Sequence, residues 1–301
     1  MTTREKEIIV FQGETQRLDR YLASHLDGVT RNQIQMMIHQ SLILVNNKAI
    51  KQNYMVKTGD LIGIEFFETD SGEIKKQDIP LDIYYEDSDV IVINKPSGMV
   101  VHPAVGNKEN TLVNALLFHC TDLSGINGKL RPGIVHRIDK DTSGLLVACK
   151  NDYSHRILSK QFADKKVTRK YYALVHGVIN HNVGVIDAPI GRDPVHRQQM
   201  TVIENGKHAI THFRVIERYK NMTLLELQLE TGRTHQIRVH MKYIGFPLVG
   251  DPVYGLKNDA NEKGQFLHAK TLGFIHPRSK EKMEWESPLP SYYSDYLKQL
   301  T

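Results

Sequence analysis

The segment GIVHRIDKDTSGLLV, Gly133–Val147, places a cluster of charged or titratable residues between two apolar runs. The members of this cluster are His136, Arg137, Asp139, Lys140 and Asp141. Burying such a cluster is costly unless its members are paired. The segment is therefore either a hydrophilic loop between two core strands or the position of a reactive carboxylate held beside a cation.

Strand alternation makes Asp139 the better candidate for chemistry in this segment. If residues 135–138 end a strand, Arg137 and Asp139 project to the same side. The following KDTSG is typical of a turn, so the side chain of Asp141 is expected to cap the backbone amide of Thr142 or the next residue. A carboxylate acts as a nucleophile or a base when a neighbouring cation keeps it ionised.

A second segment offers such a cation. Four basic or imidazole side chains crowd into LETGRTHQIRVHM, residues 229–241: Arg233, His235, Arg238 and His240. No acidic residue lies between Glu230 and Asp251. The partner of this cluster must therefore be distant in the sequence, a phosphate, or Asp139. The sequence predicts no metal site, because the two histidines lack i, i+3 or i+4 spacing and no acidic ligand is near them.

Two further segments carry candidate residues. VTRKYYALVHG, residues 167–177, contains adjacent tyrosines, Tyr171 and Tyr172, of which a strand turns one toward the core and one away. The inward tyrosine either packs or stacks on a base beside an Arg/Asp pair. INKPSGMVVHP, residues 93–103, predicts a buried strand, a Pro-Gly turn flanked by Lys95 and His102, and a second strand. Neither glycine-rich phosphate-loop pattern occurs, so no nucleotide cofactor is predicted.

The composition is that of a globular protein with a basic surplus. The chain has 301 residues, a net charge of +5 and a pI near 9.0, which is compatible with a polyanionic partner. Two cysteines without C-x-x-C spacing argue against a disulfide framework and a structural zinc site. No signal segment is seen, and no apolar run approaches the ~20 residues that cross a membrane. We therefore expect a cytoplasmic protein that does not enter a membrane.

Charge and periodicity predict two domains. Residues 17–57 carry six Lys or Arg against two Asp or Glu, whereas residues 58–75 carry five acids and one Lys. We expect a small α/β module over residues 12–67, a polar linker over 68–80 and a larger domain over 81–301. In the larger domain short strands outnumber helices and do not alternate regularly with them. This predicts an α+β fold with a mixed, mostly antiparallel sheet and flanking helices.

These segments, in this order, resemble the signature motifs of the RluA/RluD-type pseudouridine synthases, which act on ribosomal RNA. VIVINKPSGMVVHP, PGIVHRIDKDTSGLLV, RKYYALVHG, and LETGRTHQIRVHM followed by PLVGDPVYG match in turn, and the resemblance spans residues 81–290. Residues 17–62 are similar to the RNA-binding module named after a ribosomal small-subunit protein. The resemblance implies isomerisation of uridines to pseudouridine, above all in large-subunit ribosomal RNA, with neither cofactor nor metal.

The resemblance also implies roles for single residues. Asp139 matches the catalytic aspartate of the family's H-R-L-D, with Ile138 in place of Leu. Tyr171 matches the active-site tyrosine, which would turn Tyr172 toward the core, and Arg238 matches the basic residue that pairs with the aspartate. Arg137 matches the residue that fills the space left by a flipped base. The expected substrate-binding residues are His136, Arg137, Arg233 and His235, together with Arg31, Lys48 and Lys51 in the small module.

Several alternatives remain open at this point. The substrate could be tRNA, or the chain could be a ribosome-assembly factor that only binds RNA. A nucleophilic aspartate also fits an enzyme that cleaves the glycosidic bond and releases the base. In each case the expected partner is RNA, and the chain is expected to be a monomer.

Overall fold

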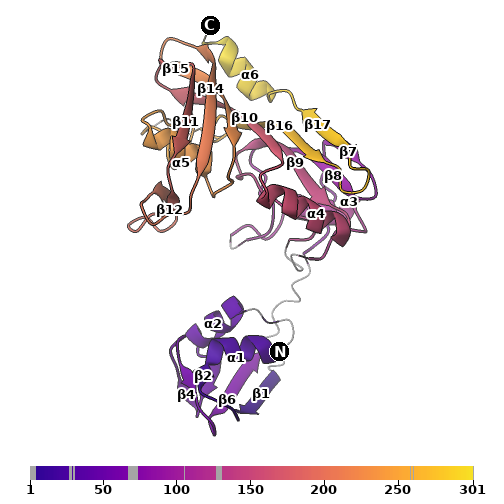
Figure 1. Cartoon of the computed structure of the whole chain (residues 1–301), viewed down its shortest axis with the longest axis vertical. Helices are drawn as coiled ribbons and strands as arrows, with labels where there is room; N and C mark the ends of the chain where they lie inside the picture. Colours follow the sequence, from indigo (N-terminus) through magenta and orange to yellow (C-terminus); the bar gives the residue numbers. More distant parts are fainter. Residues whose placement is uncertain are drawn as a thin grey trace. The chain divides into compact units, whose positions relative to one another are not determined.

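The computed structural model describes residues 5–26, 29, 31–66, 74–104, 106–126, 131–257, 259 and 261–300. The chain forms two compact units, residues 1–73 and 74–301 (Figure 1). The predicted boundary at residue 67 and residues 68–73 of the predicted linker lie outside the described residues. Within the described part of the chain, no helix combines the length and the apolar character that crossing a membrane requires.

The first unit packs two helices against a small sheet. Its elements are β1 (Glu5–Val10), β2 (Gln16–Arg17), α1 (Leu18–His25), α2 (Arg31–His39), β3 (Ile43–Val45), β4 (Lys48–Ala49), β5 (Met55–Val56) and β6 (Leu61–Phe66). The main sheet has the order β1-β6-β3-β4, and β2 pairs with β5. Leu22 of α1 and Ile34 and Ile38 of α2 recur at helical spacing, so they turn inward and pack against Ile43 and Ile62 of the sheet.

The second unit is built around one large sheet. Its elements are β7 (Ile83–Glu86), β8 (Val90–Lys95), α3 (Leu112–His119), β9 (Ser143–Cys149), α4 (Asp152–Ala163), β10 (Thr168–His176), β11 (Val183–Asp187), β12 (Ile190–Arg192), β13 (Met200–Val202), β14 (Ile210–Arg218), β15 (Met222–Leu229), α5 (Gln236–Tyr243), β16 (Leu267–Ile275), β17 (Lys282–Glu286) and α6 (Ser291–Lys298). The nine-stranded sheet runs β11-β14-β15-β10-β16-β9-β8-β7, and β17 also pairs with β16. Among the described strands only β16 and β9 pair in parallel, which confirms the predicted mixed, mostly antiparallel α+β fold.

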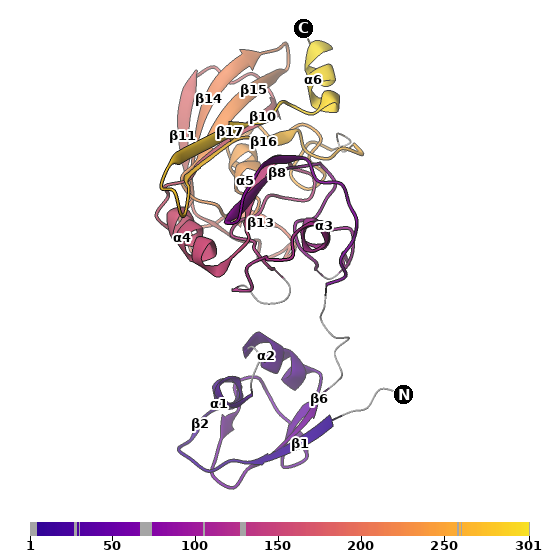
Figure 2. The ribbon, with the colours of Figure 1, turned by 90° about the vertical axis from the view of Figure 1, so that its right-hand side faces the viewer.

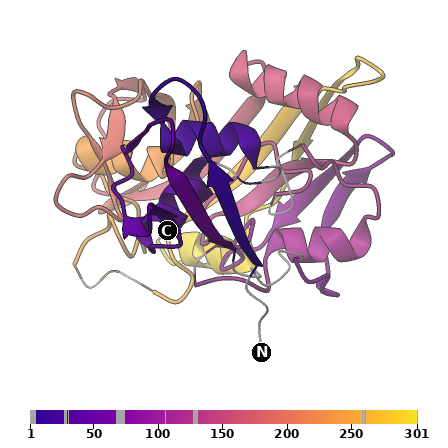
Figure 3. The ribbon, with the colours of Figure 1, turned by 90° about the horizontal axis from the view of Figure 1, so that it is seen from below.

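Alternating side chains let helices cover both faces of this sheet. In β8, Ile91 and Ile93 face one way and pack with Leu112 of α3, whereas Val90 and Val92 face the other way and pack with Leu158 of α4. Figure 3 shows α3 and α4 on opposite sides of these strands. Each strand of this region is therefore apolar on both faces, which explains the unbroken run DVIVIN in the sequence.

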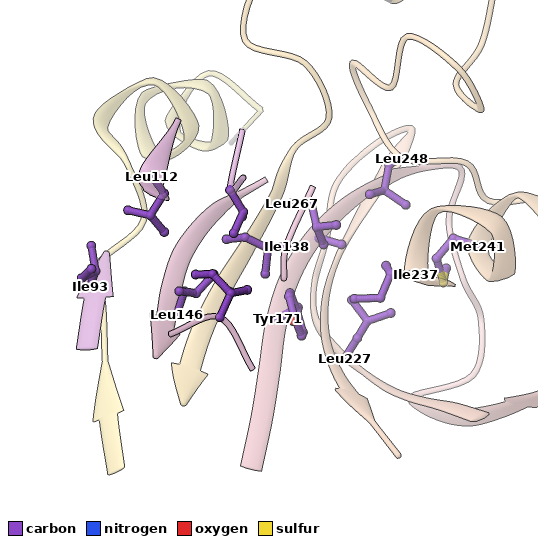
Figure 4. Packing of buried hydrophobic residues seen from close by; sticks show 14 of the residues in the cluster. Ile93, Leu112, Ile138, Leu146, Tyr171, Leu227, Ile237, Met241, Leu248 and Leu267 are labelled. Carbon is purple, nitrogen blue, oxygen red and sulfur yellow. The ribbon is translucent and has the colours of Figure 1, made fainter. Parts of the chain in front are cut away.

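The same division continues along the sheet. Ile237 and Met241 of α5 pack on the face that carries Leu227 and Leu267 (Figure 4). Tyr293 of α6 packs with Leu174 of β10 and Leu224 of β15 on the other face. Figure 2 shows α6 near these strands. The large core cluster that contains the α5 contacts also contains α3, so one continuous apolar layer lies under the loops that precede β9 and α5.

Two predicted strands are wrong. Residues 135–138 are not a strand: Ile134 forms a single bridge with Ala148, and the next ladder position is taken by the ring of His136, whose Nε2 accepts from the amide of Val147 at 3.0 Å. Residues 99–103 are not a strand either. The carbonyls of residues 100 and 101 accept from the first backbone amides of α3 at 2.9 and 3.0 Å, so they are unavailable to a ladder.

Candidate active site

A cavity of about 420 Å³ lies in the second unit, lined by the 135–142 loop, the first half of β10 and the residues that lead into α5. Its lining includes most of the residues predicted from the sequence: His136, Arg137, Asp139, Tyr171, Arg233, His235 and Arg238. The other predicted contacts belong to the first unit: Arg31, Lys48 and Lys51.

Arg238 connects two carboxylates at the cavity wall. Its Nη1 donates to Oδ2 of Asp139 at 3.0 Å. Its Nε and Nη2 donate to the two oxygens of Asp251 at 2.6 and 2.8 Å. Asp251 also accepts from the backbone amides of Val253 and Tyr254, both at 2.9 Å. The guanidinium is thereby fixed on Asp251, and its remaining nitrogen is directed at Asp139.

Arg238 and Asp251 form a buried ion pair. Arg238 is 5% exposed and Asp251 is 2% exposed. Burial alone would raise the pKa of Asp251, but the hydrogen bonds from Arg238 outweigh it and hold that pKa below its usual range. Burial alone would lower the pKa of Arg238, but Asp251 and Asp139 outweigh it and raise that pKa. Both groups stay charged at neutral pH, so Asp139 always faces a cation.

His235 lies on another side of Asp139. Its Nε2 is 4.0 Å from Oδ1 of Asp139, and its Nδ1 is 2.9 Å from the hydroxyl of Tyr254. The Tyr254 oxygen accepts from the amide of Met200 at 2.9 Å, so its own proton is available to Nδ1. Burial lowers the pKa of His235, so the ring is neutral near pH 7. A Tyr254 hydroxyl that donates to Nδ1 leaves the ring proton on Nε2, the nitrogen that faces Asp139.

Tyr171 contributes an aromatic wall to the cavity. It is 7% exposed and packs beside Ile138 and Leu227 in the core layer (Figure 4). Burial raises the pKa of its phenol, so the hydroxyl stays protonated at neutral pH. Tyr172 projects from the other face of β10 and is partly exposed. The expectation that Tyr172 faces the core is wrong, because the alternation of β10 gives that face to Tyr171 and Ala173.

His136 supports the loop that carries Asp139. Besides its bond to the amide of Val147, the ring stacks on Phe162 with centroids 4.6 Å apart. Burial lowers the pKa of His136 to about 3, and the nearby charge of Arg169 adds to this, so the ring is neutral and accepts through Nε2. Its neighbour Arg137 lines the cavity and is exposed.

Lys95 holds the same loop from the end of β8. Its side chain is fully buried, and Nζ donates to the carbonyls of Pro96, Met99 and Lys140 at 2.7, 2.8 and 2.9 Å. Burial lowers the pKa of Lys95 to about 7. Three acceptors match the three donors of an ammonium group. Because Lys140 follows Asp139 directly, this contact fixes the backbone that presents the carboxylate.

Asp141 does not make the predicted cap to Thr142. The amide of Thr142 donates instead to the backbone carbonyl of Asp139 at 3.2 Å. This bond closes a turn directly after Asp139, and β9 begins at Ser143. The turn and the Lys95 contact together restrain the backbone on the C-terminal side of the candidate carboxylate.

Gln236 closes the loop that carries the basic cluster. Its Oε1 accepts from the hydroxyl of Thr231 at 2.7 Å and from the amide of Arg233 at 2.9 Å. Its Nε2 donates to the carbonyl of Ile210 at 2.9 Å. Arg233 itself donates through Nε to the carbonyl of His208 at 2.9 Å. These bonds tie the loop to β14 and set Arg233 at the cavity.

The cavity carries more cations than acids. Its lining holds Arg137, Lys165, Arg169, Arg233 and Arg238 against Asp139 and Glu230. Glu230 lies 2.7 Å from Nε2 of His212 and accepts from Lys165 at 3.1 Å, and these two contacts lower its pKa. The surplus of positive charge suits a polyanionic substrate.

In the first unit a buried acid organises two arginines. Asp19 is fully buried in α1 and accepts from Arg17 through two nitrogens, both at 3.0 Å. It also accepts from Arg31 at 2.9 and 2.8 Å. The bonds from Arg17 outweigh burial and hold the pKa of Asp19 well below its usual range. The other two predicted contacts have exposed side chains: Lys48 and Lys51.

Two clusters outside the cavity bring metal-type donor atoms together: Glu86, His119 and Cys120, and Asp87, Asp89 and His276. In the first cluster Glu86 accepts from Lys150 at 2.8 Å, and in the second Asp89 accepts from Arg278 at 2.6 and 2.9 Å. Protein cations therefore already neutralise these carboxylates.

His240, from the basic cluster, bonds through both ring nitrogens to Thr211 and to the carbonyl of Ala188, each at 2.9 Å.

Sequence reasoning did not single out Asp251, Gln236 or Tyr254. Asp251 is the first acid after Glu230, and this position beyond the basic cluster was a usable signal for the partner of Arg238. Gln236 left no signal, because a single amide between apolar residues does not reveal which carbonyls it bonds. The role of Tyr254 depends on its contact with His235, which no sequence spacing encodes.

Comparisons with known proteins identify the family. The RNA pseudouridylate synthase family matches residues 89–243, and the S4 domain matches residues 16–62. The uncharacterized RNA pseudouridine synthase YlyB of Bacillus subtilis is 55% identical over 287 residues, which cover 95% of each chain. Ribosomal large subunit pseudouridine synthase D of Zymomonas mobilis is 46% identical over 287 residues, which cover 91% of this chain and 90% of the relative.

A solved structure gives the same result. Human RNA pseudouridylate synthase domain containing 1 aligns with 73% of this chain and 94% of its own, with a TM-score of 0.58 and 25% identity. The resemblance seen in the sequence motifs is confirmed. The chain belongs to the RNA pseudouridylate synthase family and is an isomerase that converts uridine in RNA to pseudouridine.

Proposed function

We propose that this enzyme isomerises uridines of large-subunit ribosomal RNA and that Asp139 carries out the reaction on a nucleotide flipped into the cavity. The observation that carries the proposal is the 3.0 Å contact between Asp139 and the buried Arg238 within a cationic cavity. Relatives named ribosomal large subunit pseudouridine synthase D, at 43%, 45% and 46% identity, support the choice of RNA.

Flipping is the first step of the proposed reaction. A uridine inside an RNA stack cannot reach Asp139, so the nucleotide must leave the stack at a cost of a few kcal/mol. Arg137 is exposed where it lines the cavity, and it is placed to occupy the vacated space and offset part of this cost. The cations of the lining attract the phosphates on either side of the target.

The chemical step exchanges one bond to the ribose for another. The bond between uracil N1 and ribose C1′ breaks, the base rotates, a bond forms between C5 and C1′, the C5 proton leaves, and N1 takes up a proton. Asp139 attacks C1′ or C6, or abstracts a ribose proton, and each route requires a carboxylate held in one direction. Arg238 supplies this direction because Asp251 fixes its other two nitrogens.

Tyr171 stacks on the uracil in this scheme. Its raised pKa argues against a role as the base that removes the C5 proton, because the phenol is protonated at neutral pH. Stacking requires only the ring and is compatible with rotation of the base. The remaining cavity residues, His136, Arg233 and His235, shape and charge the walls around the nucleotide.

The first unit completes the proposal. We infer that residues 12–67 form an RNA-binding module joined by residues 68–80 to the catalytic domain, residues 81–301, in a monomeric enzyme. Arg31 contacts phosphate in the orientation that Asp19 imposes, and Lys48 and Lys51 add unpaired positive charge at exposed positions. The match of residues 16–62 to the S4 domain supports this role.

The proposal is tested by mapping pseudouridine with carbodiimide-dependent reverse-transcription stops after incubation with unmodified large-subunit rRNA and with bulk tRNA. The wild type and Asp295→Asn, a change at an exposed acid of α6, are expected to give the same stops in rRNA, and Asp139→Asn none. Stops only in tRNA would overturn the choice of substrate. Equal stops with Asp139→Asn would overturn the role of Asp139, and free uracil would indicate a base-releasing enzyme.

A further inference from the structure

Arg169 is a cation of the cavity lining that has no individual role in the proposed reaction. It lies in β10 two residues before Tyr171, so strand alternation turns both side chains to the same side, and both line the cavity. Its Nε is buried and has no hydrogen-bond partner among the described residues.

The other cations of the lining are accounted for. Arg238 is bound to Asp139 and Asp251, Lys165 to Glu230, and Arg233 to a backbone carbonyl. Arg137 is exposed and solvated. Among the described residues that line the cavity, Arg169 is the only one with a buried guanidinium nitrogen, Nε, that lacks a hydrogen-bond partner.

Packing holds the guanidinium of Arg169 in a fixed place. Its Cζ lies 5.5 Å from the ring centroid of Phe162. On another side the chain at Gly232 approaches so closely that a Cβ there would lie 2.8 Å from Nη1. Nη1 and Nη2 are not among the buried atoms that lack partners, and they make no hydrogen bond with described residues. Because Arg169 lines the cavity, these two donors are available to a ligand there.

We propose that Arg169 binds a phosphate next to the target uridine, end-on through Nη1 and Nη2. A guanidinium presents two parallel donors that match two oxygens of a phosphate. Arg169 and Tyr171 are about 6.6 Å apart along the strand, from ~3.3 Å per residue. A base stacked on Tyr171 has its own backbone phosphate on the far side of its ribose. The distance between Tyr171 and Arg169 along the strand matches this separation of base and phosphate. This inference rests on the proposed placement of the uridine beside Asp139.

The test is a thermodynamic cycle between one side chain and one phosphate. Single-turnover kcat/KM is measured on a target oligonucleotide and on copies in which a neutral methylphosphonate replaces one phosphate at a time. Arg169→Met is compared with Lys170→Met, which removes the same charge from the opposite side of the same strand. Arg169→Lys keeps the charge but not the paired donors.

Arg169→Met is expected to lower kcat/KM by about 10- to 100-fold on the natural RNA, the range for charged hydrogen bonds. One methylphosphonate next to the target should cost the wild type and Lys170→Met a similar factor and cost Arg169→Met almost nothing further. The dependence of log affinity on log salt should become shallower by about 0.7 in Arg169→Met, because one phosphate contact is lost. Arg169→Lys should recover part of the activity.

Two outcomes would overturn the inference. If the loss in kcat/KM caused by Arg169→Met and the loss caused by a methylphosphonate multiply at every phosphate position, Arg169 does not bind phosphate. If Arg169→Met lowers kcat alone and no methylphosphonate matters, the guanidinium acts on the uracil instead. A fluorescence unfolding curve of Arg169→Met, read from Trp285, checks that the domain is folded, and Arg169→Lys serves as the second variant if it is not. Activity of Asp139→Asn would refute the proposed function. It would not alter the result of the Arg169 cycle, so failure of the proposed function and failure of this inference can be told apart.

Discussion

Replacing Asp251 by asparagine removes the charge that fixes Arg238 while keeping the size of the side chain. In the wild type Asp251 accepts two bonds from Arg238 and two from backbone amides. Asparagine can still accept the amide bonds through its oxygen, but its NH₂ group faces the guanidinium. The variant therefore tests the buried ion pair with the least change to the loop around it.

The expected loss of stability is large because both partners are buried. Removing one member of a buried pair leaves an uncompensated charge and costs about 3–5 kcal/mol. With a urea dependence near 3 kcal/mol per M for a domain of this size, the unfolding midpoint falls by about 1 to 1.7 M. Asp295→Asn breaks an exposed pair with Lys298 and should change the free energy of unfolding by no more than about 1 kcal/mol.

The assay uses the single tryptophan of the chain. Trp285 lies in β17, with its ring centroid 5.4 Å from that of Tyr85 and 5.3 Å from that of Phe274, so its fluorescence reports unfolding of the second unit. Urea curves are recorded for the wild type, Asp251→Asn and Asp295→Asn. Equal midpoints for Asp251→Asn and Asp295→Asn would refute the account of Arg238 as a buried cation that depends on Asp251.

The difference in stability between the wild type and Asp251→Asn should depend on pH in a definite direction. The pKa of Asp251 is lowered in the folded state, so its stabilising effect is fully present above the unfolded value of about 3.9 and is lost as the pH falls through the folded value. The gap between the wild type and Asp251→Asn should therefore stay constant from pH 7 down to about pH 4 and shrink below it. A gap that shrinks near pH 6 would assign the effect to a histidine instead.

Three further predictions concern other parts of the molecule. Because the folded pKa of Lys95 is about 7, the unfolded chain binds more protons than the folded chain above that pH. The urea midpoint of the wild type should therefore rise between about pH 7 and 9. The same rise in Lys95→Met would contradict this explanation. Tyr171→Leu should lose the stacking contribution of about 1–3 kcal/mol in single-turnover kcat/KM and Tyr171→Phe much less; equal losses would refute stacking. Asp19→Asn should weaken RNA binding measured by fluorescence anisotropy, because Arg17 and Arg31 lose their common anchor; tighter binding would mean that net charge outweighs orientation.

The parts of the fold that the sequence predicted are those set by local periodicity. Alternating or unbroken apolar runs such as DVIVIN and TLLELQLE correspond to β8 and β15, and the helical spacing of Ile34 and Ile38 corresponds to α2. In each case the pattern itself decides which face is buried, so no distant contact is needed to predict the element.

The wrong predictions depend on contacts between distant residues. The segment that carries Asp139 has the composition of a strand, but the ring of His136 takes the ladder position beside Val147, so the backbone leaves the sheet. Residues 99–103 have the apolar content of a strand, but the start of α3 takes their carbonyls. For Tyr171 and Tyr172 alternation was right, but the side that faces the core follows from how β10 packs on its neighbours.

The candidate site shows the same limit. The charge pattern favoured Asp139, the family resemblance selected Arg238 from the basic cluster, and the structure brings the two together across 99 residues. The residues that hold them, Asp251, Gln236 and Lys95, act through bonds to specific backbone groups that no spacing reveals. Arg169 is similar, since only the packed wall shows that its Nε lacks a partner.

The central claim is that the carboxylate of Asp139 performs the isomerisation. The most direct measurement is single-turnover release of tritium from a target RNA labelled at uracil C5, with binding of the same RNA measured in parallel. The account predicts that Asp139→Asn binds the RNA as tightly as the wild type and releases no tritium. Release at the wild-type rate by Asp139→Asn would contradict it, because the reaction would then not need this carboxylate.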